Sequence, residues 1–429
     1  MKKLHCIIPI IFTAVFLTAC GSKPDEESAA GFKPHLDQNT SCSITVAGSY
    51  DNFEALEAEF DRFNEIYPNV RLSYVKLDDY NNTLNMALTG NDQPNIFFSY
   101  SWMIGNEKYD PMFALAEDLS DPALSLDLNC IRSGLINHDT EGRVLMVPVF
   151  SRTYGMLVNN DLFRKEGLSV PATWTELLDV CETFRSKGYA SPMMGYSLTA
   201  SSCFMNTVAY PLFAATLAAN PEALALANDL NPAAGEYMRP ALNAVEQLIR
   251  NECIDLSICD EIEDNYTQVI LRFFEGNVPM MICTGDTVSG TRKRESQSEA
   301  FTAAPFEYTF APIPMTDDGG YFIDSPSVEF SVNKNCGNLD MTNELMRFLI
   351  TNEELNEMAS LKRLVTPTTD LSFDSVYAPF GQVPSERILS PEVIGILDPL
   401  TVQIRNAAYR VGTGELTVDE AAAMYGSLE

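Results

Sequence analysis

The sequence predicts an α/β fold built around a parallel sheet. Apolar, β-branched runs alternate with amphipathic helical segments, and residues 43–98 follow the order strand, helix, strand, helix, strand. Hydrophobic residues make up 46% of the 429 residues, which is enough to bury a core in more than one domain. We therefore expect two or three domains, at least one of them with parallel strands joined by helices.

The first strand is predicted at residues 43–48, and an amphipathic helix follows it. Asp51 and Glu54 have the spacing of an N-terminal capping box. Apolar residues then recur every three or four positions and should share one buried helix face: Phe53, Leu56, Phe60, Phe63 and Tyr67. Pro68 ends the helix.

Two further strands are predicted at residues 70–76 and 95–98, with a short helix over residues 81–89 between them. In an open α/β sheet, ligands bind beyond the carboxyl ends of the strands. The loops that leave the first and third strands, residues 48–51 and 99–102, should therefore face one site.

The later chain continues the alternation of helices and strands. Strands are expected near residues 144–149, 278–284 and 327–332, and helices near residues 237–250 and 341–360. Another helix opens at Trp174, with its apolar face at Leu177, Val180, Cys181 and Phe184. Three threonines precede a glutamate by three residues and predict helix starts: Thr173 with Glu176, Thr351 with Glu354, and Thr417 with Glu420.

The N-terminus has the pattern of a lipoprotein export signal. Lys2 and Lys3 precede an apolar stretch, residues 7–17, which is too short to span a bilayer comfortably. The ending Leu17-Thr18-Ala19-Cys20 resembles a bacterial lipobox, so residues 1–19 are expected to be a signal peptide and Cys20 to carry the lipid. Residues 20–40 then form a polar tether. The alternative is an ordinary export signal with an incidental cysteine.

The formal net charge of −31 argues against nucleic acid or an anionic lipid surface as a partner, because both favour clusters of Lys and Arg. Catalytic and metal motifs are also absent from the sequence. His138 is the only histidine after residue 40 and reads as part of a turn, so a three-histidine zinc site is impossible. No cofactor is expected.

Eight cysteines follow Cys20. Cys181 and Cys283 fall on apolar stretches and read as free core thiols. Cys253 and Cys259 form the best candidate for a disulfide, since an exported chain permits one.

Several segments together resemble bacterial extracellular solute-binding proteins, and most closely the sugar-binding lipoproteins of ABC importers that include maltose-binding protein. They occur in the family's order over about residues 42–425: Phe60–Val70, Pro94–Phe98, Asn160–Phe163 with Gly167-Leu168, Pro171 with Thr173–Leu178, Phe274–Met280, and Gly414–Ala421.

The resemblance implies a type II periplasmic-binding-protein-like fold, with two lobes and a ligand cleft between them. Each lobe would be a mixed sheet flanked by helices. Lobe one is expected at residues 41–148 plus 319–365, and lobe two at residues 149–318 plus 366–429. Pro148 and Pro312–Pro314 should lie near the strands that cross between the lobes.

A saccharide site needs flat aromatic rings and a few fixed polar groups. Trp102 should stack on the ligand, with a packing contact on the lobe surface as the alternative, whereas Trp174 matches a structural position of the family. Arg152 stands where maltose-binding protein has an acid that contacts the ligand, which suggests an acidic or unusual saccharide; the alternative is a salt-bridged surface Arg. The other expected contacts are Tyr50, Asp51, Tyr100, Ser101, Phe150, Tyr154, Gly285 and Asp286.

The resemblance thus predicts a monomeric lipoprotein on the extracytoplasmic face of the cell membrane that binds a saccharide and delivers it to the permease subunits of an ABC importer. It performs no catalysis. Thr287 replaces an aromatic residue of the family, which leaves the class of solute open. The alternatives are an extracellular glycosidase and a binding lipoprotein for a polyamine, a peptide or a phosphate ester.

Overall fold

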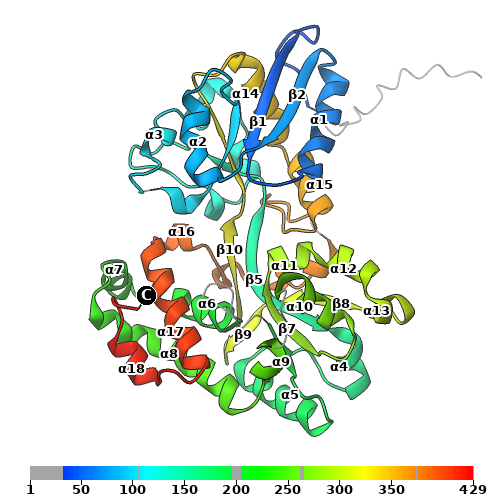
Figure 1. Cartoon of the computed structure of the whole chain (residues 1–429), viewed down its shortest axis with the longest axis vertical. Helices are drawn as coiled ribbons and strands as arrows, with labels where there is room; N and C mark the ends of the chain where they lie inside the picture. Colours follow the sequence, from blue (N-terminus) through cyan, green and yellow to red (C-terminus); the bar gives the residue numbers. More distant parts are fainter. Residues whose placement is uncertain (1–31, 105, 196–203, 261–264, 373, 429) are drawn as a thin grey trace, which may run out of the picture.

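The computed structural model describes residues 32–104, 106–195, 204–260, 265–372 and 374–428. The chain forms two lobes, one above the other in Figure 1, each built around its own sheet. The expected signal peptide, Cys20 and most of the tether lie outside the described residues. Within the described residues, no helix is long and apolar enough to cross a bilayer.

Lobe one contains a five-stranded sheet in the order β2-β1-β3-β11-β4. Strand β1 pairs in parallel with β2 and β3, as the strand-helix alternation predicts, whereas β11 runs antiparallel to both β3 and β4. The strands are β1 (Cys42–Gly48), β2 (Val70–Lys76), β3 (Ile96–Ser99), β4 (Val147–Pro148) and β11 (Glu329–Val332).

Helices cover this sheet and supply much of its core. They are α1 (Glu54–Ile66), α2 (Tyr80–Thr89), α3 (Asp110–Phe113), α14 (Leu339–Leu349) and α15 (Asn352–Lys362). The predicted apolar face of α1 is confirmed, since Phe53, Leu56, Phe60, Phe63 and Tyr67 are all buried. The predicted capping box of α1 is wrong: Phe53 is the N-cap and gives no side-chain cap, and Asp51 lies outside the helix.

Lobe two contains a seven-stranded sheet, with β12-β10-β5-β7-β6 in order, β8 beside β5 and β9 beside β10. The strands are β5 (Ser151–Asn159), β6 (Met193–Met194), β7 (Met280–Thr284), β8 (Tyr308–Ala311), β9 (Ile313–Thr316), β10 (Gly319–Pro326) and β12 (Ile388–Leu389).

The helices of lobe two surround this sheet and pack among themselves at the C-terminal end of the chain. Those between β5 and β7 are α4 (Asn160–Glu166), α5 (Trp174–Ser186), α6 (Phe204–Ala218), α7 (Pro221–Asn228), α8 (Gly235–Arg250), α9 (Leu256–Asp260) and α10 (Asn265–Phe274). Those after β7 are α11 (Gly285–Ser289), α12 (Thr291–Gln297), α13 (Glu299–Ala303), α16 (Pro391–Ile394), α17 (Asp398–Gly412) and α18 (Val418–Ala423).

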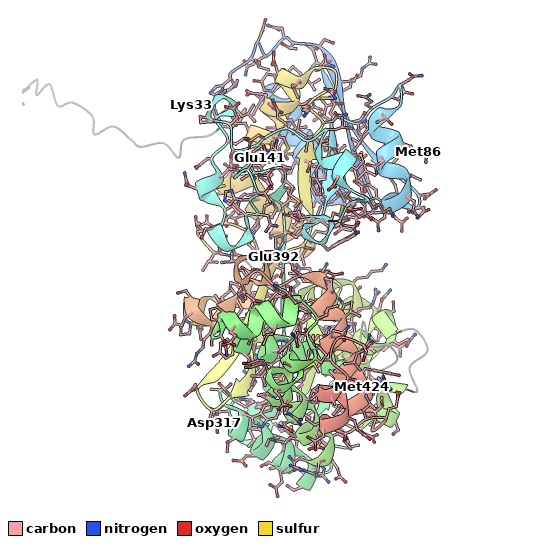
Figure 2. The ribbon with its side chains drawn as sticks, turned by 90° about the vertical axis from the view of Figure 1, so that its left-hand side faces the viewer. Lys33, Met86, Glu141, Asp317, Glu392 and Met424 are labelled. Carbon is pink, nitrogen blue, oxygen red and sulfur yellow. The ribbon has the colours of Figure 1, made fainter. Side chains whose placement is uncertain are left out.

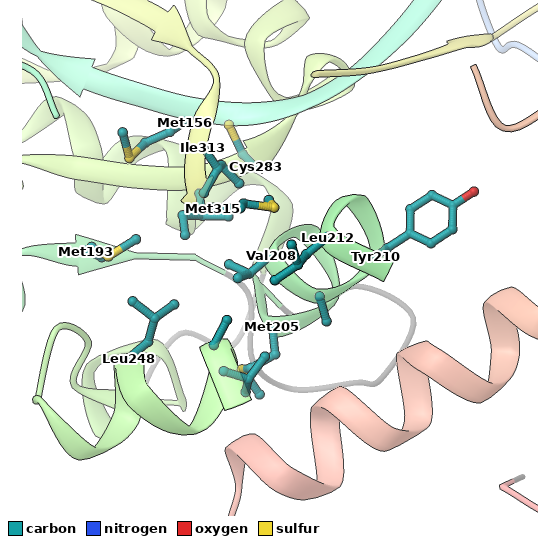
Figure 3. Packing of buried hydrophobic residues seen from close by; sticks show 14 of the residues in the cluster. Met156, Met193, Met205, Val208, Tyr210, Leu212, Leu248, Cys283, Ile313 and Met315 are labelled. Carbon is teal, nitrogen blue, oxygen red and sulfur yellow. The ribbon is translucent and has the colours of Figure 1, made fainter. Parts of the chain in front are cut away.

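The helix starts predicted at Thr173 and Thr417 are complete capping boxes, and the Thr351 side chain accepts the Glu354 N–H. Figure 3 shows part of the lobe-two core, where Met193 of β6, Leu248 of α8 and Cys283 of β7 converge. Lobe one has a separate core, so each lobe is stabilised mainly by its own buried residues.

The chain crosses between the lobes at three adjacent places. The Val149 N–H donates to the Val328 carbonyl at 2.8 Å, and the Ser327 N–H donates to the Phe150 carbonyl at 3.0 Å. The Ser151 N–H donates to Val365 at 3.3 Å, which adds the third segment. Strands β5 and β10 continue this antiparallel pair into lobe two (Figure 1).

The expected position of one crossing is wrong. Residues 312–314 lie between β8 and β9 inside the second sheet, and β10 pairs with β5, β9 and β12. The segment 319–326 therefore belongs to lobe two, and the chain returns to lobe one at residues 327–328. The sequence analysis predicts no strand over residues 319–326, and these residues carry no apolar alternation that would identify β10 or the sheet it joins.

Candidate ligand-binding site

The loops that follow β1 and β3 meet at one edge of the first sheet, as the sequence predicts. The hydroxyl groups of Ser49 and Tyr100 lie 2.9 Å apart and form a hydrogen bond between the two loops. Strands β1 and β3 are parallel neighbours, so their carboxyl ends reach the same edge.

Two aromatic rings lie stacked in the second of these loops. Tyr100 and Trp102 have ring centroids 5.9 Å apart and planes 16° apart, and the edge of Tyr109 packs against Trp102 at 5.4 Å. Trp102 is nevertheless 44% exposed. A large aromatic ring is thus held in one orientation by its neighbours while part of its surface remains open to a ligand.

The other loop contributes less than expected. The Tyr50 N–H donates to the Tyr74 hydroxyl at 2.8 Å, that hydroxyl donates to the Tyr50 carbonyl at 3.0 Å, and the Tyr50 ring packs against Phe53 and Phe98. The Asp51 side chain is 90% exposed and pairs with Lys76 at 2.5 Å, and this hydrogen bond lowers the pKa of Asp51. Tyr50 therefore serves mainly in packing.

Ser101 links the loop to a buried carboxyl group. Its hydroxyl donates to Glu329 Oε2 at 2.8 Å and accepts a hydrogen bond from Asn137 Nδ2 at 2.8 Å. Glu329 is fully buried, and burial raises its pKa to about 8. The nearby carboxyl group of Glu392 adds to this rise, so lobe two contributes a charge to the environment of a lobe-one residue.

Glu392 lies on α16 at the level where the two lobes meet (Figure 2). Its pKa is raised to about 7, mainly by burial, with the charge of Asp324 contributing to the rise and the positive charge of Arg152 opposing it. Arg152 also lowers the pKa of Tyr100, which burial raises. The charge of Arg152 therefore lowers the pKa of a tyrosine in lobe one and of a glutamate in lobe two, which is consistent with a position between the lobes.

Phe150, predicted to contact the ligand, is fully buried and packs 5.9 Å from Phe53. Its ring supports the first core, and its predicted contact with the ligand stays a prediction. Tyr154 is half-buried, pairs with Thr284 across β5 and β7, and lies with its ring 5.7 Å from that of Tyr210.

Gly285 and Asp286 begin α11 next to Tyr154. Gly285 is buried, and a Cβ at this position would lie 3.2 Å from the hydroxyl of Thr153, so the glycine allows close packing. The side chain of Asp286 lies outside the described part of the structure.

Besides Arg152, four charged residues lie at the lobe junction that the sequence analysis does not select. They are Arg132, Asp324, Glu329 and Glu392, of which Asp324 and Glu329 are almost fully buried. An acid inside an apolar strand, as in Val328-Glu329-Phe330, is the signal that could have identified them, because an isolated buried charge is costly.

The structure provides no catalytic histidine in this region. His138 is exposed, and its ring nitrogen Nδ1 lies 3.3 Å from the Gly142 carbonyl of the same turn. Among the described residues, no group of three His, Cys, Asp or Glu side chains is placed to hold a metal ion.

Comparison with known proteins agrees with this architecture. The family model for bacterial extracellular solute-binding proteins matches residues 47–355. The melibiose/raffinose/stachyose-binding protein MelE of Bacillus subtilis is 22% identical over 208 residues, which span 47% of this chain and 46% of MelE.

Solved structures share the fold over almost the whole chain. Apo RafE of Streptococcus pneumoniae superposes with a TM-score of 0.72 at 16% identity, covering 92% of this chain and 100% of RafE. The GacH receptor of Streptomyces glaucescens gives a TM-score of 0.67 at 18% identity, covering 90% and 97% of the two chains. The type II two-lobe fold is thus confirmed, and the matched family consists of binding proteins rather than enzymes. The chain belongs to the bacterial extracellular solute-binding protein family.

Proposed function

We propose that this protein is the saccharide-binding component of an ABC importer, and that it captures an oligosaccharide between its two lobes. The main observation behind this proposal is the stack of Tyr100 on Trp102 close to the lobe junction. The Trp102 ring is fixed by this stack and is still 44% exposed. Sugars present apolar C–H faces that stack on such rings and hydroxyl groups that bind fixed polar residues.

The relatives support the same class of ligand. MelE is named for melibiose, raffinose and stachyose, and RafE has been solved with raffinose. Both are distant relatives, at 22% and 17% identity to this chain, and both names refer to oligosaccharides.

The ligand surface we propose combines residues of both lobes. Tyr100, Ser101 and Trp102 come from lobe one, and Arg152, Tyr154, Gly285 and Asp286 come from lobe two. Tyr50 and Asp51 flank the surface from the loop after β1. The three hydrogen-bonded crossings act as the hinge, and closure around the ligand shifts the population toward the form that the permease recognises.

The N-terminus completes the proposal. Residues 1–19 direct export, Cys20 carries a lipid, and residues 20–40 tether a monomeric binding body to the outer face of the cell membrane. Replacement of Cys20 by Ala should release the protein from the membrane fraction and abolish labelling by radioactive palmitate. Retention of the label in Cys20→Ala would contradict the assignment.

A thermal-shift screen of the purified protein tests the ligand class. Melibiose, raffinose, stachyose and a set of acidic oligosaccharides should be compared with polyamines, peptides and phosphate esters. A bound ligand raises the melting temperature because it stabilises the folded state by RT ln(1 + [L]/Kd). A shift in melting temperature confined to non-sugar solutes would overturn the saccharide assignment. In a separate assay, release of monosaccharides from an oligosaccharide incubated with the protein would indicate a glycosidase instead.

A further inference from the structure

Three fully buried polar side chains lie in a row on one face of the first sheet. They are Ser99 at the end of β3, and Glu329 and Ser331 on β11. The hydroxyl groups of Ser99 and Ser331 lie 2.7 Å apart, and the Ser331 hydroxyl also lies 2.7 Å from the Leu145 carbonyl. Phe330, between the two β11 residues, belongs to the apolar core instead. Because a buried polar group is costly unless it is paired, the partners of this row indicate what it holds in place.

Glu329 lies at the end of the row that meets the ligand-binding loop. It is the first residue of β11 and stands opposite Ser99, the last residue of β3. Glu329 Oε2 accepts a hydrogen bond from the Ser101 hydroxyl at 2.8 Å. Asn137 Nδ2 donates to the same hydroxyl, also at 2.8 Å. The Ser101 side chain is therefore held from two sides by residues distant from it in the sequence.

Ser101 begins the short 3-10 turn, Ser101–Met103, that carries Trp102. The Met103 N–H donates to the Tyr100 carbonyl at 2.9 Å, so the shape of the turn is set locally. A local bond of this kind does not determine where the turn sits on the sheet. That placement depends on longer-range contacts, among them the hydrogen bond from Ser101 to Glu329.

The position of Glu329 in the chain also links this turn to the hinge. Residues 327–328 cross between the lobes, and the Val149 N–H donates to the Val328 carbonyl at 2.8 Å. Glu329 follows directly and pairs with Ser99, after which the chain enters the Trp102 loop. Trp102 is thus placed relative to the crossing itself, so closure brings lobe two toward a ring with a defined position.

We propose that Glu329 is a positioning residue of the saccharide site: it fixes Ser101, and through Ser101 it sets the orientation of the Trp102 ring. This inference rests on the function proposed above, in which Trp102 stacks on the sugar. A binding ring has to be held within about 0.5 Å and 10–20° of its productive position. Aromatic contacts alone allow a ring to slide, whereas a hydrogen bond is directional. The buried carboxyl group supplies that direction.

The first test uses Trp102 fluorescence without any ligand. The chain contains two tryptophans, so Trp174→Phe leaves Trp102 as the single reporter. In this background, Glu329→Leu should shift the emission to the red, raise the acrylamide quenching constant and lower the anisotropy. Glu329→Gln should restore the parent values, because its amide oxygen can accept the Ser101 hydrogen bond. Unchanged fluorescence in Glu329→Leu would overturn the proposal.

Calorimetry with raffinose as the probe measures the consequence for binding. Glu329→Leu should lower the affinity about tenfold, and Glu329→Gln should restore most of it. In a Trp102→Ala background, Glu329→Leu should cause little further loss, since a residue that acts through Trp102 then has no ring to position. Additive losses in the double variant would show that Glu329 acts by another route, and the proposal would be wrong.

Ser331→Ala is the matched control. It removes an equally buried hydroxyl from the same row, one that bonds to Ser99 and Leu145 rather than to the Trp102 loop. It should lower the melting temperature but leave Trp102 fluorescence and raffinose affinity unchanged. A fluorescence change as large as that of Glu329→Leu would assign the effect to general packing and contradict the proposal.

Asn137→Ala provides a second variant if Glu329→Leu folds poorly. Asn137 is only partly buried and holds Ser101 from the other side, so its loss should change Trp102 fluorescence in the same direction. Fluorescence that stays unchanged in Asn137→Ala would count against a hydrogen-bonded placement of the turn. If the parent protein binds no saccharide, the proposed function fails, and the ligand-free fluorescence still decides whether Glu329 positions Trp102.

Discussion

Arg132 of lobe one and the buried Asp324 of lobe two form an ion pair at the lobe junction, with Arg132 Nη2 2.9 Å from Asp324 Oδ2. The guanidinium also donates to the carbonyls of Thr366 and Thr368 and to the Ser151 hydroxyl. Burial raises the pKa of Asp324, and Arg132 counteracts this rise. One side chain therefore joins all the segments that cross between the lobes.

Replacement of Arg132 by Ala should destabilise the protein by about 3–5 kcal/mol, because it leaves Asp324 buried without its partner. Urea unfolding at pH 7 measures this loss. Arg164→Ala, which removes an exposed arginine paired with Asp161 and Glu307, is the matched control and should cost less than about 1 kcal/mol. Equal losses in the two variants would show that the junction pair has no special role.

Glu329 should make stability depend on pH. Its pKa is about 8 in the folded chain against an ordinary 4.5, because the site is buried and Glu392 lies near it. The folded state therefore holds a proton that the unfolded chain loses. The stabilising contribution is complete below about pH 4.5 and is lost as the pH rises to about 8.

Glu329→Gln removes this titration while its amide oxygen can still accept the Ser101 hydrogen bond. At pH 8 the variant should be more stable than the parent by a few kcal/mol, at about 1.4 kcal/mol per pKa unit, and at pH 4.5 the two should be similar. Denaturation curves between pH 4.5 and 8.5 test this. Glu141→Gln, in an exposed turn, is the control and should leave the pH dependence of the free energy of unfolding unchanged. If that pH dependence persists in Glu329→Gln, another group is responsible for it.

Trp102→Ala should weaken binding of the saccharide found in the screen by about tenfold to a hundredfold, since it removes the exposed stacking ring. Isothermal titration calorimetry measures the change. Trp174 donates from Nε1 to Gln247 at 2.8 Å within lobe two, so Trp174→Phe should lower stability with little change in affinity. Unchanged affinity in Trp102→Ala would remove this residue from the site.

Arg152 is the basic residue to test for ligand charge. If Arg152 binds an anionic sugar, Arg152→Ala should lower the affinity for acidic oligosaccharides far more than the affinity for neutral ones. The reason is that a guanidinium pairs with carboxylates through a planar fork. Competition binding with a neutral and an acidic sugar of equal length gives the ratio. Equal losses for both would indicate that Arg152 orients the lobes or the neighbouring Tyr100 and Glu392.

The local elements of lobe one follow from the sequence because each has its own pattern. The spacing from Phe53 to Tyr67 identifies the buried face of α1, and the meeting of the loops at Ser49 and Tyr100 follows from parallel strands. The predicted cap at Asp51 is wrong because α1 begins later, at Glu54, and the Asp51 side chain instead pairs with Lys76, which is distant in the sequence.

The other features of the fold depend on contacts between segments that are distant in the sequence. Nothing local in residues 319–326 indicates which sheet β10 joins, because a strand pattern is the same in either lobe. Phe150 lies one residue before β5, and only the packing of Phe53 against it shows that its ring points into the first core.

The position of β11 has a consequence for folding during synthesis. It lies between β3 and β4 in the first sheet, yet every strand of lobe two except β12 precedes it in the chain. Until residues 329–332 emerge from the ribosome, β3 is paired only with β1 and its other edge is open, and β4 has no partner in the sheet, so lobe one cannot close from its own N-terminal segment. A chain of this topology stays incompletely folded until it is nearly finished, and its unpaired strand edges are exposed to aggregation in the meantime.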